Sequence, residues 1–319
     1  MNSQKSFLKV KNLTKIFRLG GVLLGEKLTA VDDVNLDITG EGKIFVLAGE
    51  SGCGKSTLAK IILGIHMPTS GEVFYKGVNI FKKGFYKKRE FKREVQPVFQ
   101  NPYENFNPLV RVDVFLQETV RNLCRENNPD VIREKLNLVG LNYDEVRGKY
   151  PHEFSGGELQ RIAIARALLT NPKLLIADEP VSMLDASLRM TILNIFMDLK
   201  KMKTSTIYIT HDLATAYYIG DELAIMFRGN IVERGRVEEV LSRPLHPYTK
   251  LLIEAVPKAD PKQKIRKEIK LRKLEVKEFQ APGCKFASRC PDALPRCLKE
   301  RPKEFNINGR VVRCWLFER

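Results

Sequence analysis

The sequence predicts an α/β fold in which helices cover a largely parallel sheet. Two observations carry this prediction. A glycine-rich loop at residues 49–57 joins an apolar stretch at residues 44–48, typical of a buried strand, to a stretch with helical spacing at residues 58–63. From residue 173 to residue 227, short apolar stretches alternate with helical ones, which is typical of a parallel sheet whose connections are helices. In such a sheet we expect the chemistry at the carboxyl ends of the strands.

The loop at residues 49–57 has the composition of a phosphate-binding loop. Its glycines let backbone N–H groups converge on one point, and the helix that follows adds its positive end there. Lys55 would reach the terminal phosphates of a nucleotide, and the Ser56 hydroxyl would hold Mg²⁺. The alternative, a glycine-rich turn without function, is disfavoured by the strand before the loop and the helix after it. The loop residues expected to bind nucleotide are Ser51, Gly52, Cys53, Gly54, Lys55, Ser56 and Thr57.

The segments around this unit predict two further parts. Residues 7–13 and 30–38 alternate between apolar and polar side chains, as strands with one buried face do. After a strand expected at residues 95–99, two Asn-Pro pairs interrupt regular structure, and helical spacing resumes at residues 112–124 and 131–139. We expect these last two segments to form a small helical insert in the α/β domain.

The apolar stretch at residues 174–177 ends in two carboxylates, Asp178 and Glu179. Adjacent strand residues point to opposite sides, so the two cannot do the same job. Asp178 would support the Mg²⁺ beside Ser56 through a bound water, and Glu179 would activate the attacking water as general base. An acidic turn after a strand is an equally good explanation by itself. The phosphate loop upstream favours nucleotide hydrolysis.

Two more strand ends carry polar side chains. His211 follows a strand expected at residues 206–210, where an imidazole would lie near the γ-phosphate, although a lone histidine is more often structural. Gln100 follows the strand at residues 95–99, where its amide would coordinate Mg²⁺ or water, or merely cap the strand.

The run Ser155, Gly156, Gly157 and Glu158 opens a helix expected over residues 158–169. Serine followed three residues later by glutamate is a capping box, which is a complete structural explanation. Two glycines at a helix start also expose N–H groups to an anion, so the run is a candidate second phosphate-binding surface. Spacing alone does not say whether it serves the nucleotide of its own chain or that of a neighbour.

Four of the six cysteines lie close together near the end of the chain: Cys284, Cys290, Cys297 and Cys314. Cys53 and Cys124 lie in the phosphate loop and in a helical stretch, where packed thiols are expected. In a reducing cytoplasm, clustered thiols suggest a metal site more than disulfides. Their spacing gives comparable weight to zinc, an iron–sulfur cluster and plain packed thiols.

Composition and charge limit the possible partners. The chain has 319 residues, of which 43% are hydrophobic, and Lys plus Arg exceed Asp plus Glu by 54 to 38. The net charge of +16 favours an anionic partner, although solvated surface lysines explain the basic runs at residues 82–93 and 258–277 equally well. The sequence has neither an apolar run of roughly eighteen residues nor a signal core, so we expect a soluble, cytoplasmic protein.

The order and spacing of these motifs over residues 7–250 resemble the ATPase subunit of an ABC transporter. The motifs are the phosphate loop, Gln100, residues 154–158, Asp178 with Glu179, residues 182–185 and His211. The resemblance implies a P-loop NTPase fold over residues 1–250, with an antiparallel β subdomain and a helical subdomain at about residues 101–170. It also implies MgATP hydrolysis in a head-to-tail dimer, in which residues 155–158 close over the ATP of a related subunit.

The same resemblance assigns three further roles. Phe17 falls where the family stacks an aromatic ring on adenine, Asp185 in the loop that couples the two ATP sites, and Gln100 in the loop facing the membrane subunits. Glu158 departs from the family's commoner glutamine but keeps the capping role. Met183 replaces a commoner small residue, and the aspartate after it remains.

Shorter motifs are similar to the oligopeptide/dipeptide-type importers. They lie at residues 101–103, 107–109, 150–153, 246–249 and 283–291. This resemblance implies two different ATPases beneath two permease subunits at the cytoplasmic face of the membrane, with an extracytoplasmic binding protein that selects the solute. Some members carry oligosaccharides or nickel instead of peptides. Similar tails hold a [4Fe–4S] cluster in some members, which favours such a cluster over Zn²⁺ in the extension at residues 251–319.

Two other classes of function fit parts of the sequence. A soluble ATPase acting on nucleic acid fits the positive charge, but the chain has a single phosphate loop and no base-stacking aromatic cluster in its basic runs. We therefore expect no nucleic-acid partner. A redox protein built on the cysteine tail would show electron transfer without permease partners.

Overall fold

The computed structural model describes the chain except residues 1–5, 20–25, 125–128, 256–278, 280 and 319. Its strands are β1 (Ser6–Leu19), β2 (Glu26–Thr39), β3 (Ile44–Ala48), β4 (Ser70–Tyr75), β5 (Val78–Asn79), β6 (Val95–Val98), β7 (Leu174–Asp178), β8 (Ser205–Thr210), β9 (Glu222–Phe227), β10 (Asn230–Arg236), β11 (Phe305–Ile307) and β12 (Arg310–Val312). The basic run at residues 258–277 lies outside the described residues.

The α-helices vary from one turn to more than four. They are α1 (Lys55–Ile62), α2 (Arg89–Glu94), α3 (Val112–Thr119), α4 (Pro129–Leu138), α5 (Tyr143–Val146), α6 (Gly156–Leu168), α7 (Ala186–Lys201), α8 (Leu213–Ile219), α9 (Val237–Ser242), α10 (Pro247–Glu254) and α12 (Pro295–Lys299). Tighter or wider helical turns are η1 (Lys82–Lys87), η2 (Pro102–Asn105), η3 (Val120–Cys124), η4 (Pro151–Glu153), η5 (Ala287–Arg289) and η6 (Trp315–Phe317).

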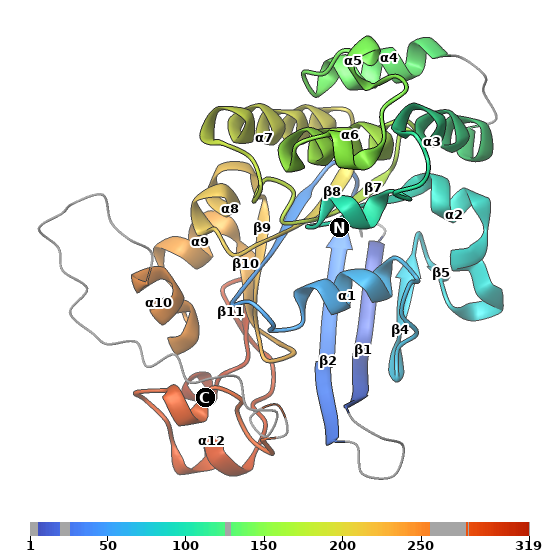
Figure 1. Ribbon diagram of the computed structural model, residues 1–319. Helices are drawn as coiled ribbons and strands as arrows, with labels where there is room; N and C mark the ends of the chain where they lie inside the picture. The colour runs from blue at the N-terminus through green and yellow to red at the C-terminus, as the bar shows by residue number, and fades with distance from the viewer. Residues whose placement is uncertain (1–5, 20–25, 125–128, 256–278, 280, 319) are drawn as a thin grey trace, which may run out of the picture.

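Two sheets organise the described chain. The larger has the order β11-β12-β10-β9-β3-β8-β7-β6, and β9, β3, β8, β7 and β6 run parallel in it. The smaller is an antiparallel sheet of order β2-β1-β4-β5. Figure 1 shows α3 to α7 gathered above the strands and the long ribbons β1 and β2 below them. The parallel sheet, the antiparallel β subdomain and the helical subdomain expected from the sequence are all present.

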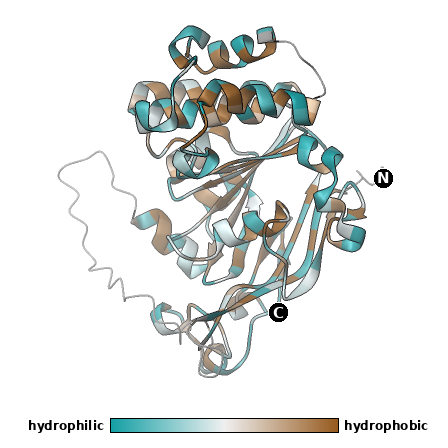
Figure 2. Ribbon diagram, turned by 45° about the vertical axis from the view of Figure 1, so that its right-hand side comes forward, coloured by the Kyte–Doolittle hydropathy of each residue, from teal (hydrophilic) through white to brown (hydrophobic). Residues whose placement is uncertain are grey.

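The central strand β3 faces two hydrophobic cores. Ile44, Val46 and Ala48 pack in the core beneath the helices, whereas Phe45 and Leu47 pack in the core shared with α1 and the β subdomain. Successive strand side chains point to opposite faces, so an unbroken apolar strand buries both. Hydrophobic residues recur along the strands between these layers (Figure 2). The phosphate loop that follows β3 therefore leaves the sheet from its most buried strand.

The C-terminal extension joins the larger sheet, a feature the sequence analysis missed. Strand β12 pairs antiparallel with β10 through Glu233–Val312 and Arg234–Val311, and β11 pairs with β12. Strands of three residues among prolines and cysteines carry too little alternation to be recognised in the sequence. The division into residues 1–250 and 251–319 stays a prediction, but β10 and β12 are hydrogen-bonded across that boundary.

Candidate nucleotide site

The glycine-rich loop runs from the end of β3 into the first turn of α1. Gly54 precedes the helix with φ 111°, and no side chain caps the helix start, so backbone N–H groups there are available to an anion. A Cβ on Gly54 would lie 2.1 Å from the Ala30 carbonyl oxygen. The loop thus requires glycine at this position for its backbone conformation and for its close approach to β2.

Lys55 is held inside the loop. Its side chain is buried, and Nζ donates to the carbonyl oxygens of Gly49 at 2.8 Å and Glu50 at 2.9 Å. The ammonium also lies 3.8 Å from the Cys53 sulfur, and burial raises the pKa of that thiol. A cation fixed at the centre of converging amides is the arrangement that attracts a polyphosphate.

The Ser56 hydroxyl and the Asp178 carboxylate meet beneath the loop. Their side chains interact, although they come from α1 and from the last residue of β7. Burial raises the pKa of Asp178, and the Ser56 contact partly opposes that effect. Hydroxyl and carboxylate oxygens are ligands that Mg²⁺ prefers, so this pair fits a magnesium ion.

Glu179 lies between Gln100 and His211. Its Oε2 accepts a hydrogen bond from Gln100 Nε2 at 3.0 Å, and its Oε1 is 2.8 Å from His211 Nδ1. The backbone N–H of Glu179 donates to the Ile209 carbonyl at 2.9 Å, and its φ is 45°, an uncommon conformation for a non-glycine residue. Parallel strands β6, β7 and β8 end at one edge, which brings together three side chains far apart in the sequence.

A cavity of about 200 Å³ lies beside the loop. Its lining includes Phe17, Leu28, Ala30, Gly52, Gly54, Lys55, Ser56, Thr57 and Phe279. Six of these were expected from the sequence; Leu28, Ala30 and Phe279 were not. Leu28 is the register partner of Phe17 in the β1–β2 pair, so a strand-pairing argument would have found it. A larger cavity of about 470 Å³ near α2 is lined by Arg89, Arg93 and Cys124 among others and holds no expected residue.

The Ser155–Glu158 run forms the expected capping box at the start of α6. Ser155 Oγ accepts from the Glu158 N–H at 3.2 Å, and Glu158 Oε2 accepts from the Ser155 N–H at 2.9 Å. The Ser155 hydroxyl also donates to Glu158 Oε2 at 2.7 Å, and this bond together with the one from the Ser155 N–H holds the pKa of Glu158 below its usual value. Ser155 is exposed, and among the described residues none of this run lines the cavity beside Lys55. Gly156 and Gly157 lie against Met183 and Leu184 respectively.

Asp185 caps the helix α7. Its Oδ1 accepts from the Leu188 N–H at 2.9 Å and from the Ser187 hydroxyl at 2.8 Å, and these bonds lower the pKa of the carboxyl. The side chain is exposed on the same loop as Met183. Capping alone accounts for these contacts; a role in coupling two ATP sites stays a prediction.

The four tail cysteines lie close together in the structure. The Cys284 N–H donates to the Cys297 carbonyl at 2.7 Å. Burial, with smaller contributions from the neighbouring Cys284, Cys290 and Cys297, raises the pKa of Cys314 to about 11. Within the described part of the chain, no three Cys, His, Asp or Glu side chains are placed to hold a metal ion. The predicted [4Fe–4S] or zinc site is therefore not supported. Cys297 and Cys314 are buried, and Cys284 and Cys290 are half-buried.

Two family profiles match successive parts of the chain. The ABC transporter profile matches residues 31–182, which include the phosphate loop, Gln100 and Glu179. The profile of the oligopeptide/dipeptide transporter C-terminal region matches residues 232–297. The chain belongs to the oligopeptide/dipeptide branch of the ABC transporter family. It is an ATP-binding subunit of that family, and such subunits are ATPases coupled to transport.

Relatives of this ABC subunit match along almost its whole length. A putative oligopeptide transport ATP-binding protein, YkfD of Bacillus subtilis, is 40% identical over 92% of this chain and 92% of its own. The dipeptide transport ATP-binding protein DppF of Escherichia coli is 37% identical over 98% and 95%. The oligopeptide transport ATP-binding protein OppF of Salmonella typhimurium is 41% identical over 86% and 84%.

Solved structures agree with the fold of this ABC subunit. The ATP-binding cassette MJ0796, in a dimeric post-hydrolysis state bound to ADP and Pi, superposes with a TM-score of 0.63 at 27% identity. The match covers 72% of this chain and 98% of the cassette. A second dimeric structure of the same cassette gives 0.61 at 28% identity.

Proposed function

We propose that this subunit binds and hydrolyses MgATP in a head-to-tail pair with a related ATPase and so drives peptide import through two permease subunits. An extracytoplasmic protein would select the solute. The proposal rests on the family and on its relatives, which are oligopeptide and dipeptide transport ATP-binding proteins. The subunit would work at the cytoplasmic face of the membrane. No described helix has the length and apolar character of a membrane span.

The arrangement around Glu179 is the single observation that carries the chemistry. Its carboxylate is held by Gln100 and His211, one residue after the Asp178 that contacts Ser56. A carboxylate oriented from both sides has few alternative positions, which is what a general base for water requires. We infer that Glu179 accepts the proton of the attacking water, His211 contacts the γ-phosphate, and Gln100 positions water or Mg²⁺ through its free oxygen.

Phosphate and metal binding would be divided among three elements. Residues 51–57 would hold the phosphates with their N–H groups, and Lys55 would turn from the loop carbonyls to the terminal phosphates. Ser56 would bind Mg²⁺ directly and Asp178 through water. When bound, the ion would neutralise charge that develops on the phosphate oxygens.

The dimer is inferred from an exposed surface. Ser155 and the start of α6 are open to solvent and lie outside the cavity, so the run is accessible to a second subunit. The matched cassette MJ0796 is dimeric in two structures. We propose that residues 155–158 complete the ATP site of the companion, which the sequence resemblance suggests is a different ATPase chain.

Replacement of the proposed general base, Glu179, tests this function in the assembled transporter. Glu179→Gln keeps the shape of the side chain and removes the basic carboxylate, so ATP should still bind while hydrolysis falls roughly 10²–10⁴-fold. Lys55→Ala is the contrasting variant, because it should weaken binding of labelled ATP itself. Normal turnover in the Glu179→Gln complex would remove that residue from the role of base.

The metal in the tail stays a prediction separate from this function. No step of ATP hydrolysis or transport proposed above uses the four tail cysteines. Analysis of iron and zinc after anaerobic purification tests the prediction directly.

A further inference from the structure

Phe279, a residue of the C-terminal extension, lies on the cavity beside the phosphate loop. Its ring is only 3% exposed, and it lines the cavity together with Phe17, Leu28 and Ala30. Those three residues come from β1 and β2, and the remaining lining residues come from the loop and α1. Phe279 is therefore the lining residue contributed from the far end of the sequence.

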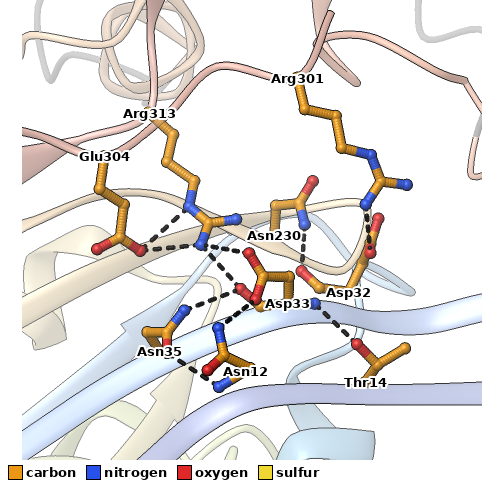
Figure 3. A network of polar contacts seen from close by, with 9 residues as sticks. All are labelled: Asn12, Thr14, Asp32, Asp33, Asn35, Asn230, Arg301, Glu304 and Arg313. Carbon is orange, nitrogen blue, oxygen red and sulfur yellow. Dashed lines mark hydrogen bonds and ion pairs between the residues drawn. The ribbon is translucent and has the colours of Figure 1, made fainter. Parts of the chain in front are cut away.

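The extension is fastened to β2 just beyond this cavity. Asp32, two residues after Ala30, pairs with Lys285 at 3.3 Å, and both side chains are almost fully buried. Arg301 donates to the other Asp32 oxygen at 2.9 Å. Arg313 donates to the backbone and side-chain oxygens of the neighbouring Asp33 at 2.8 and 3.1 Å. Figure 3 shows Arg301 and Arg313 reaching from the extension to these two aspartates.

A second set of contacts fastens the extension to the phosphate loop. Arg289 Nη2 donates to Glu50 Oε1 at 3.0 Å, and its guanidinium lies over the Phe227 ring at 5.0 Å. Phe286 packs against Phe227 and Tyr248, and the Tyr248 hydroxyl accepts from the Glu50 N–H at 3.1 Å. The extension thus contacts β2 and the phosphate loop, two of the elements that contribute residues to the cavity lining. The Asp32–Lys285 pair is the buried ion pair among these contacts.

The lining of the cavity combines two chemistries. The glycines, Lys55, Ser56 and Thr57 suit phosphates, whereas Phe17, Leu28, Ala30 and Phe279 are apolar. A nucleobase presents two flat faces, and a planar ring against an aromatic side chain is favourable whichever base it is. One aromatic residue covers one such face; the cavity here offers two.

We propose that Phe279 forms a second aromatic wall for the adenine base, so that the C-terminal extension is part of the nucleotide site and contributes affinity for the base. The proposal rests on the ATPase function proposed above and deepens it. It predicts that Phe279 affects ligands with a base and leaves ligands without one unaffected.

Binding of two ligands to the full-length chain separates these cases. We would measure dissociation constants for MgATP and for magnesium tripolyphosphate, which has the phosphates but no base, with wild type, Phe279→Ala and Phe279→Tyr. Loss of one base-stacking ring corresponds to about a 5- to 150-fold weaker ATP affinity. Tripolyphosphate should bind Phe279→Ala within about twofold of wild type, and Phe279→Tyr, which keeps the ring, should bind ATP nearly normally.

A matched control and the contrary outcomes complete the test. Leu298→Ala removes an exposed apolar side chain of the same extension and should leave both affinities unchanged. Should Phe279→Ala unfold, Phe279→Leu keeps an apolar side chain while removing the ring, and the same comparison applies. Unchanged or tighter ATP binding, or equal loss of both ligands, would overturn the proposal while leaving the ATPase function intact. A wild-type chain that binds neither ligand, alone or in the assembled transporter, would instead refute the ATPase function.

Discussion

Burial of His246 should make the fold sensitive to mild acid. The residue caps α10, is 1% exposed, and its Nδ1 accepts from the Tyr248 N–H at 3.0 Å. The His246 backbone N–H donates to Glu233 Oε2 at 2.9 Å, and the ring atom Nε2 has no partner among the described residues. Burial lowers the pKa of the imidazole from 6.5 to about 3.

The sign and size of the effect follow from proton binding. Between pH 6.5 and about 3, the unfolded chain holds a proton on this imidazole and the folded chain does not. Proton binding therefore stabilises the unfolded state as the pH falls, and the free energy of unfolding decreases. With these two pKa values, lowering the pH from 7 to 5 should cost about 2 kcal/mol from this one group.

Urea unfolding at pH 7 and pH 5 measures that difference. His246→Asn removes the titrating group and keeps a side-chain oxygen that caps a helix well. The variant should lose about 2 kcal/mol less than wild type between the two pH values. His152→Asn, at an exposed position, should change the loss little. An equal loss in wild type and His246→Asn would refute the reasoning.

Three further changes follow from particular contacts. Gly54→Ala should abolish ATP binding, because the added Cβ would lie 2.1 Å from the Ala30 carbonyl oxygen. Gly77→Ala is the control. Its backbone strain is similar, but its Cβ would have no described atom within 4 Å, so this variant should bind ATP normally in the same assay. Asp32→Asn should lower the free energy of unfolding by about 3–5 kcal/mol, because it leaves the buried Lys285 ammonium unpaired. Asp37→Asn, at an exposed pair with Lys9, should cost at most about 1 kcal/mol, and equal losses in urea unfolding would contradict this account. A tail metal site predicts iron or zinc in elemental analysis that is lost in Cys314→Ser; a chain purified anaerobically without either metal would end that prediction.

Local patterns predicted the strands, helices and loop that carry the site. An apolar strand buries both its faces, so β3 and β7 were recognisable from unbroken apolar stretches, and the ends of both were found within a residue. The capping box at Ser155 was predicted because its hydrogen bonds join residues three apart. These features depend on neighbours in the sequence, so the sequence contains the information.

The cysteine tail shows where spacing is insufficient. Four thiols in one short segment are compatible with a metal site or with packing, and the choice depends on side-chain directions in three dimensions. The short strands β11 and β12 were not predicted either, because three residues give too little periodicity to distinguish a strand from a loop.

The sequence by itself determined the phosphate loop, the capped helix and the identity of the acidic pair, because each is set by backbone geometry within a few residues. Only the tertiary structure decided that Gln100 and His211 hold Glu179, since that contact requires three strands to end at one edge. It alone also decided that Phe279 reaches the nucleotide cavity. Ion pairs such as Asp32–Lys285 bring the end of the chain to its beginning, and no local pattern records a contact between residues so far apart.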